Sequence, residues 1–208
     1  HGLGIVPVDA EPVGPVSEYG SDRIFLQLRL ESQREAAQDA LVAALAEAGH
    51  PVVVLTLHDP MQLGGEFFRW EIATAVAGSV LGINPFDQPD VESAKLQTRA
   101  LHDVDAVAQA EAGMVWSVEE GVSVLVDAVN GVRLEEFCGT PTLAGAIGAL
   151  LAQLDERDYF ALLAFIAMTP AHREILQRLR SLVRAHYRAA TCLYFGPRYL
   201  HWTRQLHH

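Results

Sequence analysis

Two apolar segments near the N-terminus predict parallel β-strands joined by a helix. Residues 23–30 read as a strand, and residues 51–57 are a nearly continuous run of β-branched and aliphatic side chains, which is typical of strands buried on both faces of a parallel sheet. Between them, residues 32–48 place alanine and leucine on one helical face, with Ser32 as the expected N-cap and Gly49 as the stop. A strand, a helix and a strand at this spacing form a right-handed crossover unit, so we expect an α/β fold.

The rest of the chain keeps alternating between helical and strand-like patterns. The helix expected over residues 66–80 has Phe67, Trp70 and Ile72 on its inner face, and residues 9–20, rich in proline and glycine, are irregular. Further along, we expect helices over 90–112, 142–154 and 170–187, short strands near Val115 and over 122–126, and buried strands over 159–168 and 190–195.

The pattern changes after residue 112, which predicts two domains. The first covers residues 1–112, and an additional α/β lobe covers residues 113–208 and ends in a histidine-bearing loop. The fold class that we expect is a three-layer α/β sandwich with a mainly parallel sheet, plus this smaller C-terminal lobe. In such a fold, ligands bind at the carboxyl ends of the strands.

Charge and cysteine content narrow the functional classes. The 208 residues carry a formal net charge of -11 and no stripe rich in lysine and arginine, which argues against a nucleic-acid partner. Cys138 and Cys192 form neither a disulfide framework nor a metal-spaced pair, so we expect a cytoplasmic protein. We expect no membrane partner, because no apolar run is long enough to cross a bilayer and no signal pattern opens the chain. The closing pair His207-His208 fits either a native end or the start of a purification tag.

Lys95 is the only lysine in the chain, and every other strongly basic side chain is an arginine. An arginine stays protonated in ordinary sites, whereas a buried lysine can release its proton, so Lys95 can transfer protons where an arginine can only bind charge. Asp90 is the expected N-cap of the helix over 90–112, which places Lys95 in the second turn, facing the loop with Asp87 and Gln88. Drift of the composition toward arginine is the alternative explanation of a single lysine.

Three segments carry a family resemblance. The run Phe86-Asp87-Gln88, Val91-Glu92 and Lys95 resembles the signature of phosphoglucose isomerases, also called glucose-6-phosphate isomerases. Residues 64–75 (GGEFFRWEIATA) and 195–201 (FGPRYLH) resemble the isomerase half of the bifunctional transaldolase/phosphoglucose isomerases. The resemblance extends over nearly the whole chain, and it implies a sugar-isomerase (SIS) domain, whose fold is flavodoxin-like.

The resemblance implies an isomerase that interconverts glucose 6-phosphate and fructose 6-phosphate. This reaction opens the sugar ring and moves a proton between neighbouring carbons through an enediolate, so it needs an acid/base pair, a carboxylate base and positive charge. In the family, the signature lysine and a histidine act in ring opening, and these roles fall on Lys95 and His201. His201 resembles the histidine of the family's leucine-histidine-serine-x-glycine-glutamine segment, although Trp202 replaces the serine and Arg204 the glycine. The alternative is a surface histidine.

Two further residues are candidates for substrate binding. Gln88 precedes the N-terminus of the helix over 90–112, where its amide can bond hydroxyls or phosphate oxygens together with backbone amides. A side chain that only braces the loop is the equal alternative. Arg198 stands two residues after a glycine that ends a strand, so it can approach the site beside His201.

The resemblance also implies parts that the chain lacks. The family's base glutamate precedes a segment that matches residues 2–8, and the arginine that stabilises the enediolate belongs to the other sugar-isomerase domain. Glu66 and Glu92 are available carboxylates, but each fits the first turn of a helix, where the dipole favours an acid. We therefore expect little or no turnover from the isolated chain. The expected partners are the remaining isomerase domain and, as a further candidate, a transaldolase domain.

We expect no cofactor and no metal. The histidines between residues 50 and 186 show no convergent ligand spacing; they are His50, His58, His102, His172 and His186. Arginines follow the helix over 170–187 and are expected along its exposed side, on a solvated face or in salt bridges; they are Arg173, Arg178, Arg180, Arg184 and Arg188.

Two other functional classes stay open. A non-catalytic sugar-phosphate-binding module has the same fold, but a pure binder gains from the fixed bidentate fork of arginine, whereas an acid/base site requires lysine. A structural interaction lobe would leave Lys95 exposed and away from any cleft. The position and reactivity of Lys95 therefore discriminate among the three.

Overall fold

The computed structural model describes residues 4–87, 96, 99, 114–119, 121–126, 128–138 and 142–197. The chain forms two compact units, one of residues 1–87 and 157–208 and the other of residues 88–156. The predicted domain boundary at residue 112 falls outside the described ranges, so that division stays a prediction.

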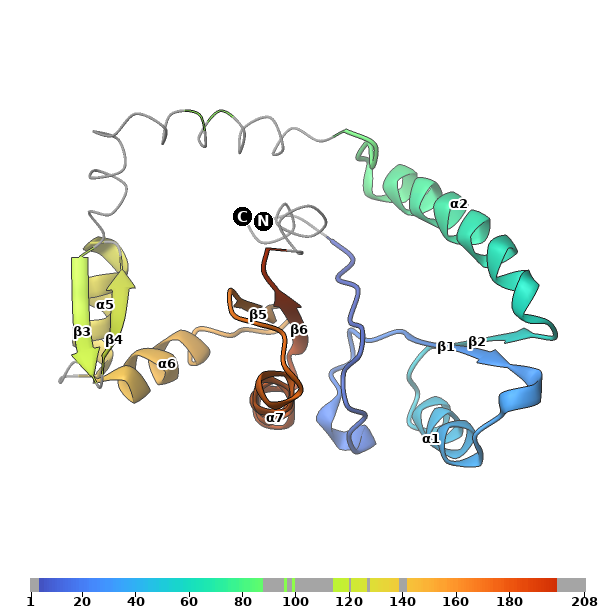
Figure 1. Ribbon diagram of the computed structural model, residues 1–208, viewed down its shortest axis with the longest axis horizontal. Helices are drawn as coiled ribbons and strands as arrows, with labels where there is room; N and C mark the ends of the chain where they lie inside the picture. The colour runs from blue at the N-terminus through green and yellow to red at the C-terminus, as the bar shows by residue number, and fades with distance from the viewer. Residues whose placement is uncertain are drawn as a thin grey trace. The chain divides into compact units, whose positions relative to one another are not determined.

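The first unit begins with the predicted strand, helix and strand (Figure 1). Strands β1 (Phe25–Leu30) and β2 (Val52–Leu57) pair in parallel, with Phe25 opposite Val52 and Leu30 opposite Leu57. Helix α1 (Ala36–Glu47) joins them, and Gly49 follows it with a φ of 91°, a left-handed conformation that glycine adopts without steric cost. The parallel pairing expected from the apolar runs is confirmed. The expected burial of β2 on both faces is wrong for the described residues, because Val53 is 43% and Val54 is 41% exposed.

Helix α1 begins later than predicted. Ser32 lies in a 3₁₀ turn, η2 (Glu31–Gln33), and the N-cap of α1 is Glu35, whose side chain makes no capping bond. The backbone at Arg34 is extended, and its guanidinium bonds the carboxylate of Asp39 at 2.8 Å. The predicted capping role of Ser32 is therefore wrong, because the chain is still extended at Arg34 and α1 starts only at Ala36.

Helix α2 (Leu63–Leu81) follows β2 after the 3₁₀ turn η3 (Pro60–Gln62). It contains the whole predicted helix and ends at Gly82, which has a φ of 71°. The predicted inner face of aromatic and aliphatic side chains is not buried among the described residues, because Phe67, for example, is 63% exposed. The helix is apolar on several sides, a composition typical of helices that are buried in a complete protein.

Residues 114–151 of the second unit, as far as they are described, form a β-hairpin and two helices. Strands β3 (Met114–Glu119) and β4 (Val122–Val126) pair antiparallel across a turn with Gly121 at a φ of 82°. Helix α5 (Ala128–Cys138), which the sequence patterns did not predict, is followed by helix α6 (Leu143–Leu151). The buried core of this unit consists of Leu134 of α5 and Ala146 and Ala149 of α6. The partly buried side chains of Val124 and Val126 in the hairpin pack against it.

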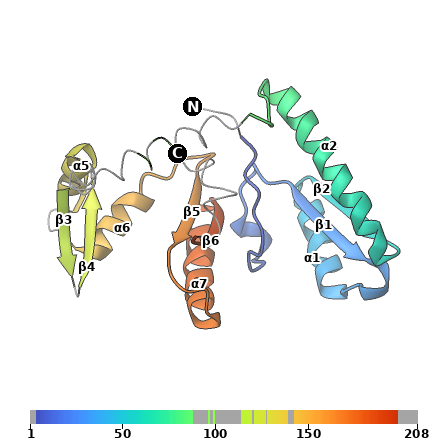
Figure 2. The same cartoon turned by 45° about the horizontal axis from the view of Figure 1, so that its top comes forward.

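The C-terminal part of the first unit is a second parallel strand pair with a helix (Figure 2). Strands β5 (Tyr159–Ala164) and β6 (Ala190–Phe195) are joined by helix α7 (Pro170–Tyr187). The bounds predicted for α7 and β6 are confirmed. Strand β5 is shorter than predicted, because the chain turns after Ala164 and Thr169 then caps α7 by accepting a bond from the amide of His172 at 3.2 Å.

The arginines of α7 were expected along its exposed side, but two of them are buried. Arg178 is exposed, but Arg180 is 1% and Arg184 is 4% exposed. Both are partnered by acids of residues 7–18, a segment that we call the N-terminal strap and that includes the 3₁₀ turn η1 (Val16–Glu18). Arg180 and Arg184 therefore form salt bridges, which was the alternative to a solvated face.

The fold class is confirmed at the level of a mixed α/β protein. The described residues form three two-stranded sheets, of which β1–β2 and β5–β6 are parallel and β3–β4 is antiparallel. A single three-layer sandwich of the sugar-isomerase type stays a prediction.

Candidate functional site

The residues predicted for the site lie outside the described residues. Gln88, Lys95, Arg198 and His201 all belong to this group, as does the alternative base Glu92. Their roles stay predictions. The structure does describe the two segments that lead to them, residues 83–87 before Gln88 and residues 195–197 before Arg198.

The loop before Gln88 is folded tightly onto the end of α2. The amide of Ile83 donates to the carbonyl of Gly78 at 2.9 Å, which closes the helix around Gly82. A Cβ added at Gly78 would lie 2.6 Å from Cδ of Pro85, so only glycine lets the loop approach this closely. The side chain of Asn84 then accepts a bond from the amide of Phe86 at 3.1 Å. The first residues of the isomerase-like signature thus have a defined conformation.

The segment that leads to Arg198, residues 195–197, leaves the β5–β6 pair at the carboxyl edge. The amide of Gly196 donates to the carbonyl of Ala164 at 2.8 Å, so the parallel pairing continues one residue beyond Phe195. A Cβ at Gly196 would lie 2.2 Å from the ring of Phe165. The chain therefore enters the segment with Arg198 from the edge at which α/β proteins bind ligands.

Glu66 is the described carboxylate that was considered as a base. It lies in the first turn of α2 and is 4% exposed, with Oε1 3.3 Å from Nη2 of Arg69 and with Oε2 unpartnered. At a rise of about 1.5 Å per residue, Glu66 is about 22 Å along the helix from Leu81, where the signature loop begins. This separation favours the structural role at the helix N-terminus that the sequence suggested.

A polar cluster that the sequence patterns did not predict lies beside β1–β2. Asp39 of α1 accepts bonds from Arg29 at 2.5 Å, Arg34 at 2.8 Å and Gln27 at 3.1 Å. Bonds from Arg34, Gln27 and Arg29 lower the pKa of Asp39 to about 2. Arg29 also donates to the hydroxyl of Thr56, its partner in the strand register. The carboxylate is thus held as an anion and fixes α1 against the strands.

His58 and Glu31 meet at the carboxyl edge of the same strand pair. Each follows the last residue of its strand, and Nδ1 of His58 lies 2.6 Å from Oε2 of Glu31. The hydrogen bond and charge of His58 lower the pKa of the Glu31 carboxyl. Both side chains are exposed, so the pair is an accessible acid/base couple. The pair could have been predicted from the sequence, because the residues that directly follow parallel strands meet at the same edge of the sheet.

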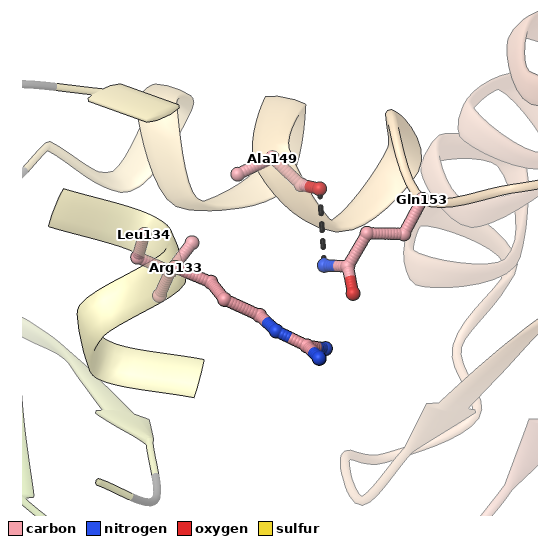
Figure 3. Close-up of a pocket in the computed structure, with 4 residues that line it drawn as sticks. All are labelled: Arg133, Leu134, Ala149 and Gln153. Atoms are coloured by element: carbon pink, nitrogen blue, oxygen red, sulfur yellow. Dashed lines mark hydrogen bonds between the residues drawn. The ribbon is translucent and has the colours of Figure 1, made fainter. Parts of the chain in front are cut away.

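A cavity of about 230 Å³ lies between α5 and α6 in the second unit (Figure 3). Its walls are Arg133, Leu134, Ala149 and Gln153, and Figure 3 shows the Arg133 side chain extending toward Gln153. The Gln153 amide nitrogen donates to the carbonyl of Ala149 at 3.2 Å. A guanidinium and an amide oxygen on an apolar floor can bind a small polar group, although no predicted site residue is among these four.

Cys192 is a buried free thiol at the start of β6. Its Sγ donates to the carbonyl of Pro7 at 3.6 Å, and burial raises its pKa. Burial and the neighbouring Cys192 raise the pKa of Tyr194 to about 12. Both groups stay protonated near neutral pH, which argues against Cys192 as a nucleophile.

The described part of the chain contains neither a metal-binding cluster nor a membrane-spanning helix. No cluster of three or more histidine, cysteine, aspartate or glutamate side chains there is arranged to hold a metal ion. No helix in those ranges has the length and apolar character needed to cross a membrane.

Comparison with curated proteins finds several glucose-6-phosphate isomerases. The chain is 39% identical over 67 residues to that of Streptococcus equi subsp. zooepidemicus, which is 31% of this chain and 15% of the relative. It is 41% identical over 63 residues to that of Limosilactobacillus reuteri, 28% of this chain and 14% of the relative. It is 36% identical over 85 residues to that of Lactobacillus helveticus, 39% of this chain and 19% of the relative.

These matches are partial in both directions. The chain spans less than a fifth of the length of these relatives. No protein-family model matches it, and no solved structure does. About a third of the chain is therefore similar in sequence to glucose-6-phosphate isomerases.

Proposed function

We propose that this chain is part of a glucose-6-phosphate isomerase that interconverts glucose 6-phosphate and fructose 6-phosphate. The observation that carries the proposal is the similarity of about a third of the chain to enzymes of that name. The signature-like run that ends at Lys95 also supports it, because its residue types and spacing resemble those of the family.

In the proposed mechanism, Lys95 and His201 exchange protons with the ring oxygen and the adjacent hydroxyl while the sugar ring opens. Lysine suits this step because its amine can both hold and release a proton, which an arginine does not do. Gln88 and Arg198 bind hydroxyl or phosphate oxygens of the substrate. A carboxylate base and an arginine from further polypeptide move the carbon proton and stabilise the enediolate.

The described segments are compatible with this arrangement. Because Gly78 has no Cβ, Pro85 packs directly against the end of α2, and this contact positions the loop that precedes Gln88. The chain that leads to Arg198 leaves the carboxyl edge of a parallel strand pair. The distance of Glu66 from that loop, about 22 Å along α2, supports a base supplied by another segment.

We propose that this chain is one part of a longer protein. The matched segments cover only a small share of the relatives, so the missing base and arginine belong, in our proposal, to a second sugar-isomerase domain. We further propose the bifunctional transaldolase type, on the likeness of residues 64–75 and 195–201 to that class. The isolated chain then has little or no turnover, since loss of a general base alone costs about 10² to 10⁴-fold.

The first experiment is a coupled assay of fructose 6-phosphate conversion by this chain, with Lys95→Met and Lys95→Arg beside it. The proposal expects no turnover from any of the three and weak binding of glucose 6-phosphate that Lys95→Met reduces. Turnover that Lys95→Met abolishes would show a complete site in this chain. Binding that is equal in all three would favour a non-catalytic sugar-phosphate-binding module.

A further inference from the structure

The N-terminal strap is held to the rest of the first unit by polar contacts. None of residues 4–18 is buried, and the side chains of Val8 and Val13 are exposed. Carbonyl groups of the strap accept bonds instead: Ala10 from Gln177 at 2.7 Å and Pro12 from Arg184 at 2.5 Å. A segment attached in this way gains little from the hydrophobic effect, so its attachment depends on charge and hydrogen bonding.

The carboxylate of Glu11 lies at the centre of this attachment. Its Oε1 accepts a bond from the hydroxyl of Thr191 and is 3.7 Å from Nε of Arg180. Its Oε2 is 3.2 Å from Nη1 of Arg184. Two guanidinium groups and a hydroxyl donor thus converge on one anionic group.

Two of the receiving groups, Arg180 and Thr191, are held in place by contacts within α7 and β6. Nε and Nη2 of Arg180 donate to the hydroxyl and carbonyl of Thr191 at 2.9 and 2.7 Å, and Nη1 donates to Gln177 at 3.2 Å. Thr191 is fully buried. These bonds do not involve the strap, so the arginine and the hydroxyl stay positioned when Glu11 leaves.

Removal of Glu11 would leave buried positive charge without its counter-charge. Burial lowers the pKa of Arg180, and the carboxylate of Glu11 opposes this effect. A buried guanidinium requires an anion, and guanidinium groups bind phosphate oxygens as they bind carboxylates. A small phosphate ion offers more acceptor oxygens than a carboxylate does.

We propose that Arg180, Arg184 and Thr191 form an oxyanion-binding site for phosphate groups, which Glu11 fills from within the chain while the strap is attached. Phosphate competes with Glu11 and releases the strap. None of these three residues is among those proposed for the isomerase site around Lys95.

The test measures amide hydrogen exchange of residues 4–20 and calorimetric binding of inorganic phosphate, at constant ionic strength set with chloride. Phosphate is expected to increase exchange of the strap in a saturable way. Glu11→Gln removes the competing charge but keeps the side-chain size, so it is expected to bind phosphate at least tenfold more tightly than the wild type. Glu18→Gln is the matched control, because Glu18 contacts Arg184 but neither Arg180 nor Thr191 in the contacts described.

Arg180→Met is expected to abolish phosphate binding, whereas Arg178→Met, on the exposed side of α7, is expected to retain it. Lys95→Met is also expected to leave the phosphate-dependent exchange unchanged, which separates this site from the proposed isomerase site. Glucose 6-phosphate in place of phosphate distinguishes a phosphate monoester from the free ion as the preferred ligand. The proposal is overturned if strap exchange in the wild type does not respond to phosphate, or if a folded Glu11→Gln binds it no more tightly.

Discussion

Glu18 accepts two hydrogen bonds from Arg184, at 3.0 Å from Nε and 2.8 Å from Nη2, although 166 residues separate the two in sequence. Tyr19 adds its ring, whose centre lies 5.3 Å from the guanidinium carbon. Gly14 passes so close that a Cβ there would lie 2.2 Å from Nη2 of Arg184. These contacts fix the N-terminal strap against α7, and Arg184 is the residue on which most of them converge.

Arg184→Met is expected to destabilise the protein by about 3 kcal/mol, at the lower end of the cost of breaking a buried ion pair. The lower end applies because Glu11 and Glu18 keep some access to water after the change. Urea unfolding followed by circular dichroism measures the loss. Arg178→Met, an exposed arginine on the same helix, should stay within about 0.5 kcal/mol of the wild type; equal losses in both variants would contradict the role given to Arg184.

Asp39 makes the stability depend on acid pH. Its carboxyl has a folded-state pKa of about 2, below the ordinary value of 3.8. A lowered pKa contributes stability that is present above the unfolded-state pKa and is lost as the pH falls toward the folded-state value. The melting temperature should therefore fall between about pH 4 and pH 2, and Asp39→Asn should flatten that slope.

Glu47→Gln, at the other end of α1, is the control for this titration. It removes a carboxylate that is exposed, so its melting curve should keep the wild-type slope over the same pH range. An Asp39→Asn curve that parallels the wild type would show that the cluster with Arg29 and Arg34 does not hold the carboxylate as described.

Gly78→Ala tests the close approach of the signature loop to α2. An alanine within a helix gains about 1 kcal/mol over glycine, but overpacking costs about 1 to 3 kcal/mol, and the rigid ring of Pro85 cannot rotate away. We expect net destabilisation and faster amide exchange over residues 83–87. Gly65→Ala, which meets nothing within 4 Å, should be neutral or stabilising. A stabilising Gly78→Ala would contradict the contact.

Thr169→Ala removes the N-cap of α7. The hydroxyl accepts a bond from the amide of His172 at 3.2 Å, and such caps contribute about 1 kcal/mol. The same unfolding assay should show this loss, and Thr169→Ser should recover most of it because serine keeps the hydroxyl. Loss in the serine variant as large as in the alanine variant would point to the methyl group instead.

Local patterns predicted most of the elements that the structure describes. The apolar run over 51–57 identified β2, and Pro170 marked the start of α7, because strand composition and the preference of proline for the first helical turn are local properties of the sequence. Helix α5 was not predicted, since its segment contains Asn130 and Gly131 and has only a weak apolar pattern. The short range of these signals explains both results.

Contacts between distant segments could not be predicted in this way. Helical spacing placed Arg180 and Arg184 among the exposed arginines of α7, because their partner Glu11 is about 170 residues away and no local pattern links them. The contact between His58 and Glu31 could have been predicted from the sequence, since both residues follow strands of one crossover unit. For the proposed isomerase site, the motif around Lys95 predicts residue roles, and their geometry stays a prediction.

We propose that Lys95 is the proton-transferring lysine of a glucose-6-phosphate isomerase. The measurement uses a chimera in which residues 64–95 replace the corresponding segment of the Streptococcus equi glucose-6-phosphate isomerase, because in our proposal the rest of such an enzyme supplies the base and the arginine. In the coupled fructose 6-phosphate assay, the folded chimera should turn over, and Lys95→Met should lower kcat by about 10² to 10⁴-fold with little change in stability. A folded chimera whose turnover is unaffected by Lys95→Met would contradict the claim.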